Sequence, residues 1–113
     1  MNVQQMNDPH LNAWIAEHIM HIPRERIFYT ALGMEMVSTQ IEEYATDRNA
    51  CAEMEAEIAR RGSTVKYLYL GCLCDVTGTD FELYDYKTVW LLTTATPRQR
   101  CEAAYIAMQE PQP

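Results

Sequence analysis

Basic residues are scarce in this sequence, and so are long apolar stretches. Nine lysine and arginine residues stand against 16 aspartate and glutamate residues, which gives a net charge of −7 and an isoelectric point near 4.8. Such a charge disfavours a sequence-independent grip on DNA or on an anionic membrane. No window approaches the roughly 18 to 20 apolar residues of a membrane span. We therefore expect no direct nucleic-acid binding and no membrane partner.

An export signal and the short motifs of common enzymes are also missing. The polar segment over residues 1–10 has no basic stretch followed by an apolar core, which predicts a chain that stays in the cytoplasm. In that compartment the four cysteines are expected to be reduced thiols. Phosphate loops, nucleophile elbows, zinc-protease motifs and dinucleotide fingerprints do not occur. The sequence thus predicts a protein that is not an enzyme and has no cofactor.

What is present suffices for one globular domain. The chain has 113 residues, of which 48% are apolar and 22% are charged, and these values are typical of a single folded unit. We expect residues 8–110 to form that domain. Residues 1–7 are expected to be a disordered N-terminal tail, and residues 111–113 a short C-terminal tail.

Three helices are indicated by their ends and by the spacing of their apolar residues. Asp8 as a cap, followed by proline, begins a helix that runs to about residue 21. A polar cap and a closing glycine bound a second helix within residues 46–62. The capping box Thr96–Gln99, with proline at the first helical position, begins the third.

The remaining segments favour strands. Residues 27–32 are rich in residues that prefer strands, and residues 64–76 predict one long or bulged strand with Gly71 as its irregular point. Residues 81–86 would pair back as a hairpin, and residues 89–94 would add a third strand. Because such strands need helices to cover their apolar faces, the order of elements predicts an α+β fold. The expected architecture is a layered α/β/α sandwich with a mostly antiparallel sheet flanked by helices.

Three stretches carry a resemblance to a known family. They are LNAWIAEHIM over residues 11–20, YATDRNAC over residues 44–51 and ATPRQRCEAA over residues 95–104. Their order and spacing resemble the phage ABA sandwich domain proteins, which are small proteins of phages and prophages. The resemblance implies an α/β/α sandwich in the cytoplasm of an infected or lysogenic bacterial host. It implies no agreed catalytic activity and carries over no catalytic residues.

Two groups of side chains could support chemistry, and for each we favour a structural role. Cys72 and Cys74 would share one face of a strand, and His18 with His21 could complete a zinc site. Structural zinc sites usually have longer cysteine spacings, so we expect buried cysteines and no metal. Cys101 lies beside two arginines, where a thiol could be activated, but its place on an apolar stripe indicates the core.

Arginine and aromatic residues supply the candidate binding site. Seven of the nine basic residues are arginine, whose planar side chain suits phosphate and carboxylate. Two of them lie at the start of the last expected helix, where backbone N–H groups also favour anions. With aromatic faces of the adjacent sheet they would form a pocket for a nucleotide-like ligand. The candidate residues are Arg24, Arg26, Tyr67, Tyr69, Trp90, Arg98 and Arg100. The expected function is that of a small phage accessory protein that sequesters a nucleotide-like signal, as in counter-defence.

The acidity supports an alternative function. Ten of the sixteen acidic residues, but three of the nine basic ones, fall within residues 1–57. An acidic surface of this kind can bind a basic surface on a host protein, by nucleic-acid mimicry or by simple charge matching. The alternative is therefore an acidic inhibitor of a host protein. A homodimer is compatible with either function, because small sandwiches often leave a sheet edge to cover.

Overall fold

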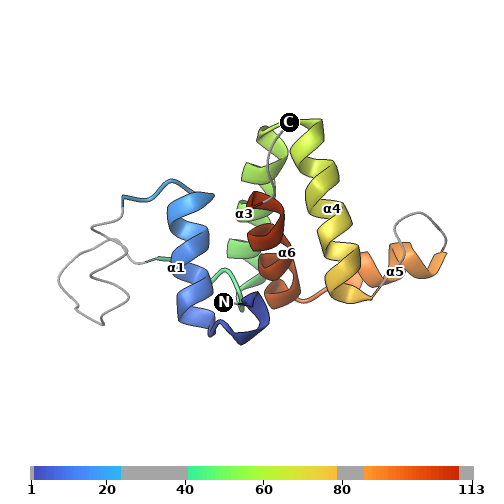
Figure 1. Ribbon diagram of the computed structural model, residues 1–113, viewed down its shortest axis with the longest axis horizontal. Coiled ribbons are helices and arrows are strands. Elements are labelled where there is room, and N and C mark those ends of the chain that lie inside the picture. The colour runs from blue at the N-terminus through green and yellow to red at the C-terminus, as the bar shows by residue number, and fades with distance from the viewer. Residues whose placement is uncertain (1, 24–40, 79–85, 110–113) are drawn as a thin grey trace.

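The described residues of the protein form helices connected by short links (Figure 1). The computed structural model describes residues 2–23, 41–78 and 86–109. The elements are η1 (Val3–Gln5), α1 (Asp8–His18), α3 (Arg48–Arg60), α4 (Ser63–Thr77), α5 (Tyr86–Thr94) and α6 (Pro97–Gln109). No strand occurs within these described ranges. The expected strand over residues 27–32 lies outside them.

The three helices predicted from their caps are present. Asp47 is the N-cap of α3, and its carboxylate accepts hydrogen bonds from backbone N–H groups of the first turn. Thr96 and Gln99 form a reciprocal capping box at the start of α6, with contacts of 2.9 and 3.1 Å. The cap of α1 is Asn7 and not Asp8, since the Asn7 side chain accepts from the His10 N–H. This helix ends at His18, about one turn before the expected end.

The expected sheet is wrong, because residues 64–76 and 89–94 belong to helices α4 and α5. The β-branched and aromatic residues within residues 64–76 favour strands. The apolar residues of the same segment, however, also recur every three or four residues. That spacing places one stripe along a helix, and its members are buried or packed against the core: Val65, Leu68, Tyr69, Cys72, Leu73 and Val76. Gly78, with a φ of 74°, ends α4 in the left-handed conformation. The described part of the chain is therefore helical, where a layered α+β sandwich was expected.

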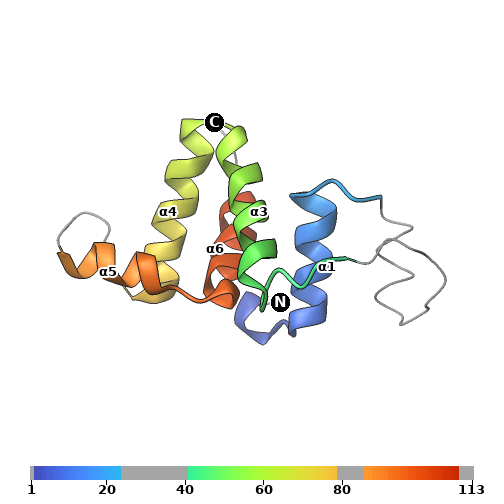
Figure 2. The ribbon, with the colours of Figure 1, turned by 180° about the vertical axis from the view of Figure 1, so that it is seen from behind.

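Helix α6 lies at the centre of the molecule. In the two opposite views, α1 stands on one side of it and α4 on the other, and α3 covers it from behind (Figures 1 and 2). Its most extensive packing is against α4, and it also contacts α1, α3 and η1. The small buried residues of α6 allow this close approach from several sides; they are Cys101, Ala103, Ala104 and Ala107.

Helix α5 has a different position. It extends sideways from the lower end of α4, away from the other helices (Figure 2), and among those helices it packs chiefly against α4. Val89 and Trp90 on this helix are 53% and 58% exposed. The core of the protein therefore forms without the apolar side chains of these two residues.

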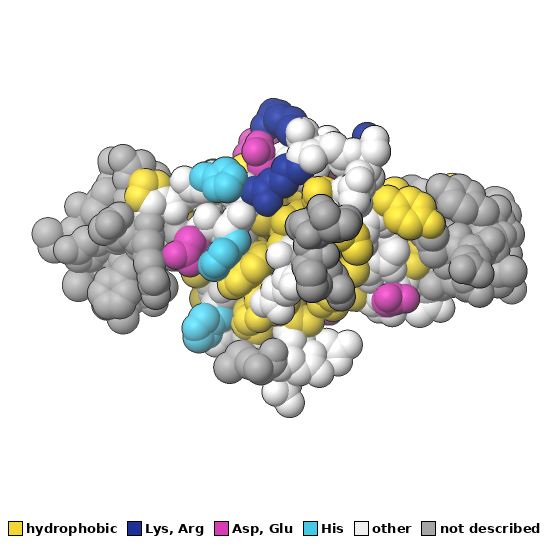
Figure 3. Space-filling model, turned by 45° about the horizontal axis from the view of Figure 1, so that its top comes forward, with side chains coloured by type: hydrophobic (Ala, Val, Ile, Leu, Met, Phe, Trp, Pro, Cys, Tyr) yellow, Lys and Arg dark blue, Asp and Glu magenta, His cyan; other side chains and the backbone are white. Residues whose placement is uncertain are grey.

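Part of the expected N-terminal tail packs against the core. Val3 is 5% exposed and belongs to the core, and η1 is capped by the Asn2 side chain. Figure 3 shows histidine side chains in a row along one edge of an apolar area of the surface, with an acidic side chain next to them. No helix within the described ranges combines the length and the apolar character that a bilayer span requires.

Candidate functional site

Arg100 ties three helices together. Its guanidinium donates to the Glu55 carboxylate of α3 over 2.9 Å and to the backbone carbonyl of Leu92 over 2.7 Å. Further contacts reach the carbonyls of Thr93 and Ala95 at 3.3 and 3.1 Å. The C-terminal end of a helix carries unpaired carbonyls and partial negative charge, so a guanidinium there satisfies the end of α5. Arg100 thus connects α6 to α3 and α5 through hydrogen bonds, and its role is structural.

Glu55 also receives a hydrogen bond from α4. The Tyr69 hydroxyl donates to the same carboxylate over 2.5 Å. Burial raises the pKa of the Tyr69 phenol, and the neighbouring Glu55 charge raises it further. Burial alone lowers the pKa of Arg100, but the Glu55 carboxylate outweighs that effect and the pKa is raised. The guanidinium of Arg100 is therefore charged, and the phenol of Tyr69 is neutral.

Arg98 fixes the N-terminal segment to α6. It donates to Glu102 over 2.7 Å and to Asp8 over 2.8 Å. It also donates to the carbonyls of Val3 and Met6, over 2.9 and 2.6 Å. Burial works to lower the pKa of Arg98, but the two carboxylate partners raise it overall. Its donors are directed to protein groups, so this side chain serves the fold.

Arg61 has a similar role that the sequence analysis missed. It follows α3 and donates to the carbonyls of His18 and Ile19 at the end of α1, over 3.2 and 2.9 Å. It also lies 3.0 Å from His21 Nε2 and donates to the Met108 sulfur over 3.3 Å. A basic residue directly after a helix was a visible signal, but its target on another helix was not.

A pocket of about 220 Å³ opens between the first turns of α3 and α6. Its lining residues are Arg48, Cys51, Glu55, Pro97 and Arg100. Two helix N-termini meet there, and each carries partial positive charge. Arg48 is exposed and makes no hydrogen bond or ion pair with another residue that the structure describes. The pocket therefore presents the free guanidinium of Arg48, the ion pair of Arg100 with Glu55, and the thiol of Cys51.

One thiol lines this pocket. Cys51, on the first turn of α3, is 2% exposed, and Cys101 on α6 is fully buried. Cys51 Sγ lies 3.9 Å from the Pro97 carbonyl oxygen, and Cys101 Sγ lies 3.9 Å from the Met54 sulfur. All four cysteines are free thiols.

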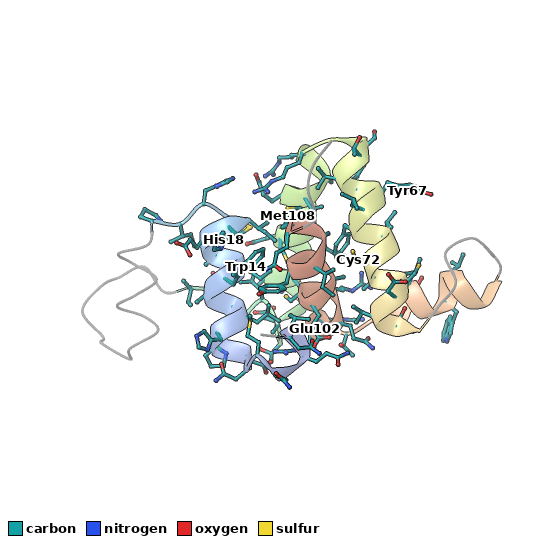
Figure 4. All side chains as sticks on the ribbon, in the orientation of Figure 1. Trp14, His18, Tyr67, Cys72, Glu102 and Met108 are labelled. Atoms are coloured by element: carbon teal, nitrogen blue, oxygen red, sulfur yellow. The ribbon has the colours of Figure 1, made fainter. Side chains whose placement is uncertain are left out.

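The candidate aromatic residues do not gather around the arginines. Tyr67 points away from the bundle on α4 (Figure 4) and is 66% exposed, whereas Tyr69 is buried against Glu55. Trp90 is exposed on α5. None of the three lines the pocket. Arg24 and Arg26 fall outside the described residues.

The hypothetical zinc site required Cys72 and Cys74 on one face of a strand, but both residues lie on the helix α4. Residues two apart on a helix are separated by about 200° and do not share a face. Cys72 points toward α6 in Figure 4, and Cys74 is buried as well. His18 stacks on Trp14 with ring centroids 4.5 Å apart. Across the part of the chain that the structure describes, no three histidine, cysteine or acidic residues cluster as metal ligands would.

The protein was compared with known families, curated proteins and solved structures. A scan against protein-family models found no match, and searches of curated proteins and of solved structures also found none. The sandwich implied by the resemblance to the phage ABA family is contradicted by the helices α4 and α5. Membership of that family stays a prediction from three short motifs.

Proposed function

We propose that this protein is a cytoplasmic binding protein that holds a small phosphorylated ligand, nucleotide-like in kind, in the pocket between α3 and α6. The observation that supports the proposal is the position of Arg48 and Arg100 at a pocket where two helices begin. Guanidinium groups and helix N-termini both favour phosphate. The guanidinium of Arg48 is available to a ligand without breaking the fold, because it is exposed and bonds no other residue that the structure describes.

The size of the pocket limits what it would hold. Sites for complete drug-sized ligands usually span about 300 to 1,000 Å³, and this pocket has about 220 Å³. A phosphate or ribose-phosphate group would fit inside, and the rest of a larger ligand would lie outside. In this proposal Arg48 binds the phosphate, and Tyr67 and Trp90 take no part in binding.

Calorimetric titration of the reduced protein tests the proposal. The probes are inorganic phosphate, pyrophosphate, ADP-ribose and a cyclic dinucleotide, with chloride and acetate as anion controls. Arg48→Ala is expected to weaken binding about tenfold, because it removes one charge-assisted contact. The control is Arg60→Ala, which removes the same charge from the other end of α3. The proposal fails if no phosphorylated probe binds, or if both variants bind as well as the unaltered protein.

Alanine at residue 98 or 100 is unsuitable for this test. Both side chains hold helix ends through backbone carbonyls, so their loss would change the fold before it changed a ligand contact. Arg48 makes no such contact with the described residues, so Arg48→Ala tests ligand binding without removing a contact that holds the fold.

An acidic surface supports the second candidate function, inhibition of a basic host protein. Glu42, Glu43, Asp47 and Glu53 are all exposed on α3 or on the segment that precedes it. A host protein retained on the immobilised chain should be released by salt, and a charge reversal such as Glu53→Lys should weaken its retention. If neither salt nor Glu53→Lys weakens the retention of the host protein, inhibition through the acidic surface is excluded. A phage setting for either function rests on the motif resemblance alone.

A further inference from the structure

Glu55 brings an available hydrogen-bond acceptor to the pocket between α3 and α6. Both hydrogen bonds at this carboxylate, from Arg100 and from Tyr69, end on the same oxygen, Oε2. The second oxygen, Oε1, accepts no hydrogen bond from the residues that the structure describes. Glu55 lines the pocket, and 29% of its side chain is exposed. A carboxylate oxygen accepts hydrogen bonds, so Oε1 is available to a ligand group that donates one.

Arg100 brings a donor to the same carboxylate. A guanidinium has five N–H donors in a fixed plane. The Nε–H of Arg100 donates to the Ala95 carbonyl. Its Nη2 donates to the carbonyls of Leu92 and Thr93. Its Nη1 carries two N–H groups, and among the described residues it bonds Glu55 alone. One N–H of Nη1 is therefore available beside the Glu55 carboxylate.

A donor next to an acceptor is complementary to a hydroxyl group. A hydroxyl donates one hydrogen bond and accepts others, so it can bond to Oε1 of Glu55 and to Nη1 of Arg100 at the same time. An ionised phosphate oxygen accepts hydrogen bonds and donates none, so it would leave Oε1 without a donor. The pair Glu55–Arg100 therefore favours a hydroxyl over a phosphate oxygen at this wall of the pocket.

The guanidinium of Arg48 lies at a different place along the pocket. Arg48, Cys51 and Glu55 all line the pocket from α3, at the helical spacing that places residues on one face. The Cα atoms of Arg48 and Glu55 are separated by about 10 Å along the helix axis, which is two turns. A ligand that contacts both side chains therefore carries its phosphate at one end and its hydroxyl several bonds away.

We propose that the pocket selects sugar phosphates, such as the ribose 5-phosphate part of a nucleotide, with the pair Glu55–Arg100 binding a sugar hydroxyl. This inference rests on the proposed function, because it leaves the phosphate with Arg48. It adds the side chains that determine specificity. It also distinguishes the expected ligand from inorganic phosphate and from phosphate esters that carry no hydroxyl.

Calorimetric titration of the reduced protein with two matched phosphate esters tests the inference. Ribose 5-phosphate carries hydroxyl groups on its sugar, whereas n-pentyl phosphate has the same number of carbon atoms and no hydroxyl. Ribose 5-phosphate is expected to bind at least about tenfold more tightly, because it adds hydrogen bonds to a carboxylate and a guanidinium.

Two variants separate the hydroxyl contact from the phosphate contact. In Glu55→Gln the amide oxygen would still accept from Arg100 and Tyr69, and the NH₂ group, a donor, would replace Oε1. The preference for ribose 5-phosphate over n-pentyl phosphate should then fall below about threefold. The matched control is Arg48→Ala, which should weaken the binding of both esters by the same factor and leave the preference unchanged. Circular dichroism shows whether each variant folds.

The outcomes distinguish this inference from the proposed function. If the two esters bind the unaltered protein equally well, the selection of sugar phosphates is overturned and the phosphate site stands. The inference is also overturned if folded Glu55→Gln keeps the full preference. If neither ester binds, the phosphate site fails and the inference fails with it. Should Glu55→Gln not fold, the comparison of the two esters on the unaltered protein decides alone.

Discussion

Glu55 on α3 accepts hydrogen bonds from Arg100 on α6 and from Tyr69 on α4 at the same carboxylate oxygen. The pair Glu55–Arg100 is more than a surface ion pair, because only 29% and 20% of the two side chains are exposed. Through its contacts with carbonyls at the end of α5, Arg100 extends this joint to a fourth helix. This guanidinium thereby adds polar contacts at the end of α5, a helix that packs chiefly against α4.

Arg100→Ala is expected to lower the free energy of unfolding by about 2 kcal/mol. The substitution leaves a partly buried carboxylate and several carbonyls without their donor, and such losses typically cost about 1 to 3 kcal/mol. Urea unfolding followed by circular dichroism measures the change. Arg60→Ala is the control, since Arg60 is 72% exposed in its pair with Glu57 and should cost less than about 0.5 kcal/mol. An equal loss of unfolding free energy in the two variants would contradict the structural role of Arg100.

Alkaline pH is expected to destabilise the protein through buried tyrosines. Burial, with help from Glu42 and Glu53, raises the pKa of Tyr44 to about 12, and burial also raises that of Tyr69. An unfolded phenol titrates near pH 10, so between about pH 10 and 12 the folded state holds protons that the unfolded state releases. Stability is complete below about pH 10 and falls as the pH rises through that interval.

Urea midpoints measured across this pH range, with tyrosinate absorbance as a second signal, test the prediction. Tyr69→Phe should be less stable at neutral pH, because it loses the bond to Glu55, but it should lose less stability at alkaline pH. A midpoint that holds steady beyond pH 11 in the unaltered protein would show that these phenols ionise without unfolding.

Gly71 inside α4 and Gly78 directly after it are expected to respond in opposite directions to alanine. Gly71 lies inside the helix, and a Cβ there would meet no atom within 4 Å. Gly71→Ala should therefore raise the free energy of unfolding by about 0.5 to 1 kcal/mol. Gly78 has a φ of 74°, so Gly78→Ala should lower it by about 1 kcal/mol. Thermal unfolding of both variants checks the signs, and destabilisation by Gly71→Ala would contradict the helical assignment.

The fold was predictable where capping chemistry was local. Asp47 and the pair Thr96–Gln99 specify helix starts through side chains that bond their own backbone, so a single sequence suffices to place them. In α4 two local signals conflict, since many residue types favour a strand while the spacing of apolar residues favours a helix. Packing against α6 decides that conflict, and packing is not visible in a list of residue types.

The candidate site was predictable only in part. Arg100 was identified from its position near the start of a helix, but its partners on α3 and α5 depend on how the helices assemble. Arg48 and Cys51 were missed as site residues, although the capped start of α3 places both on its first turn. Their meeting with Pro97 and Arg100 required α3 and α6 to begin at the same place, which no local pattern encodes.

The central position of α6 has a consequence for synthesis on the ribosome. Among the described helices it is the last to be made, yet α1, α3, α4 and η1 all pack against it. Until α6 emerges from the ribosome, the apolar faces of the earlier helices have no common packing partner. They stay exposed to solvent or are covered by a chaperone. The nascent chain is therefore most vulnerable to aggregation and proteolysis late in translation, and a ribosome stalled before residue 97 would hold a chain that cannot complete its core.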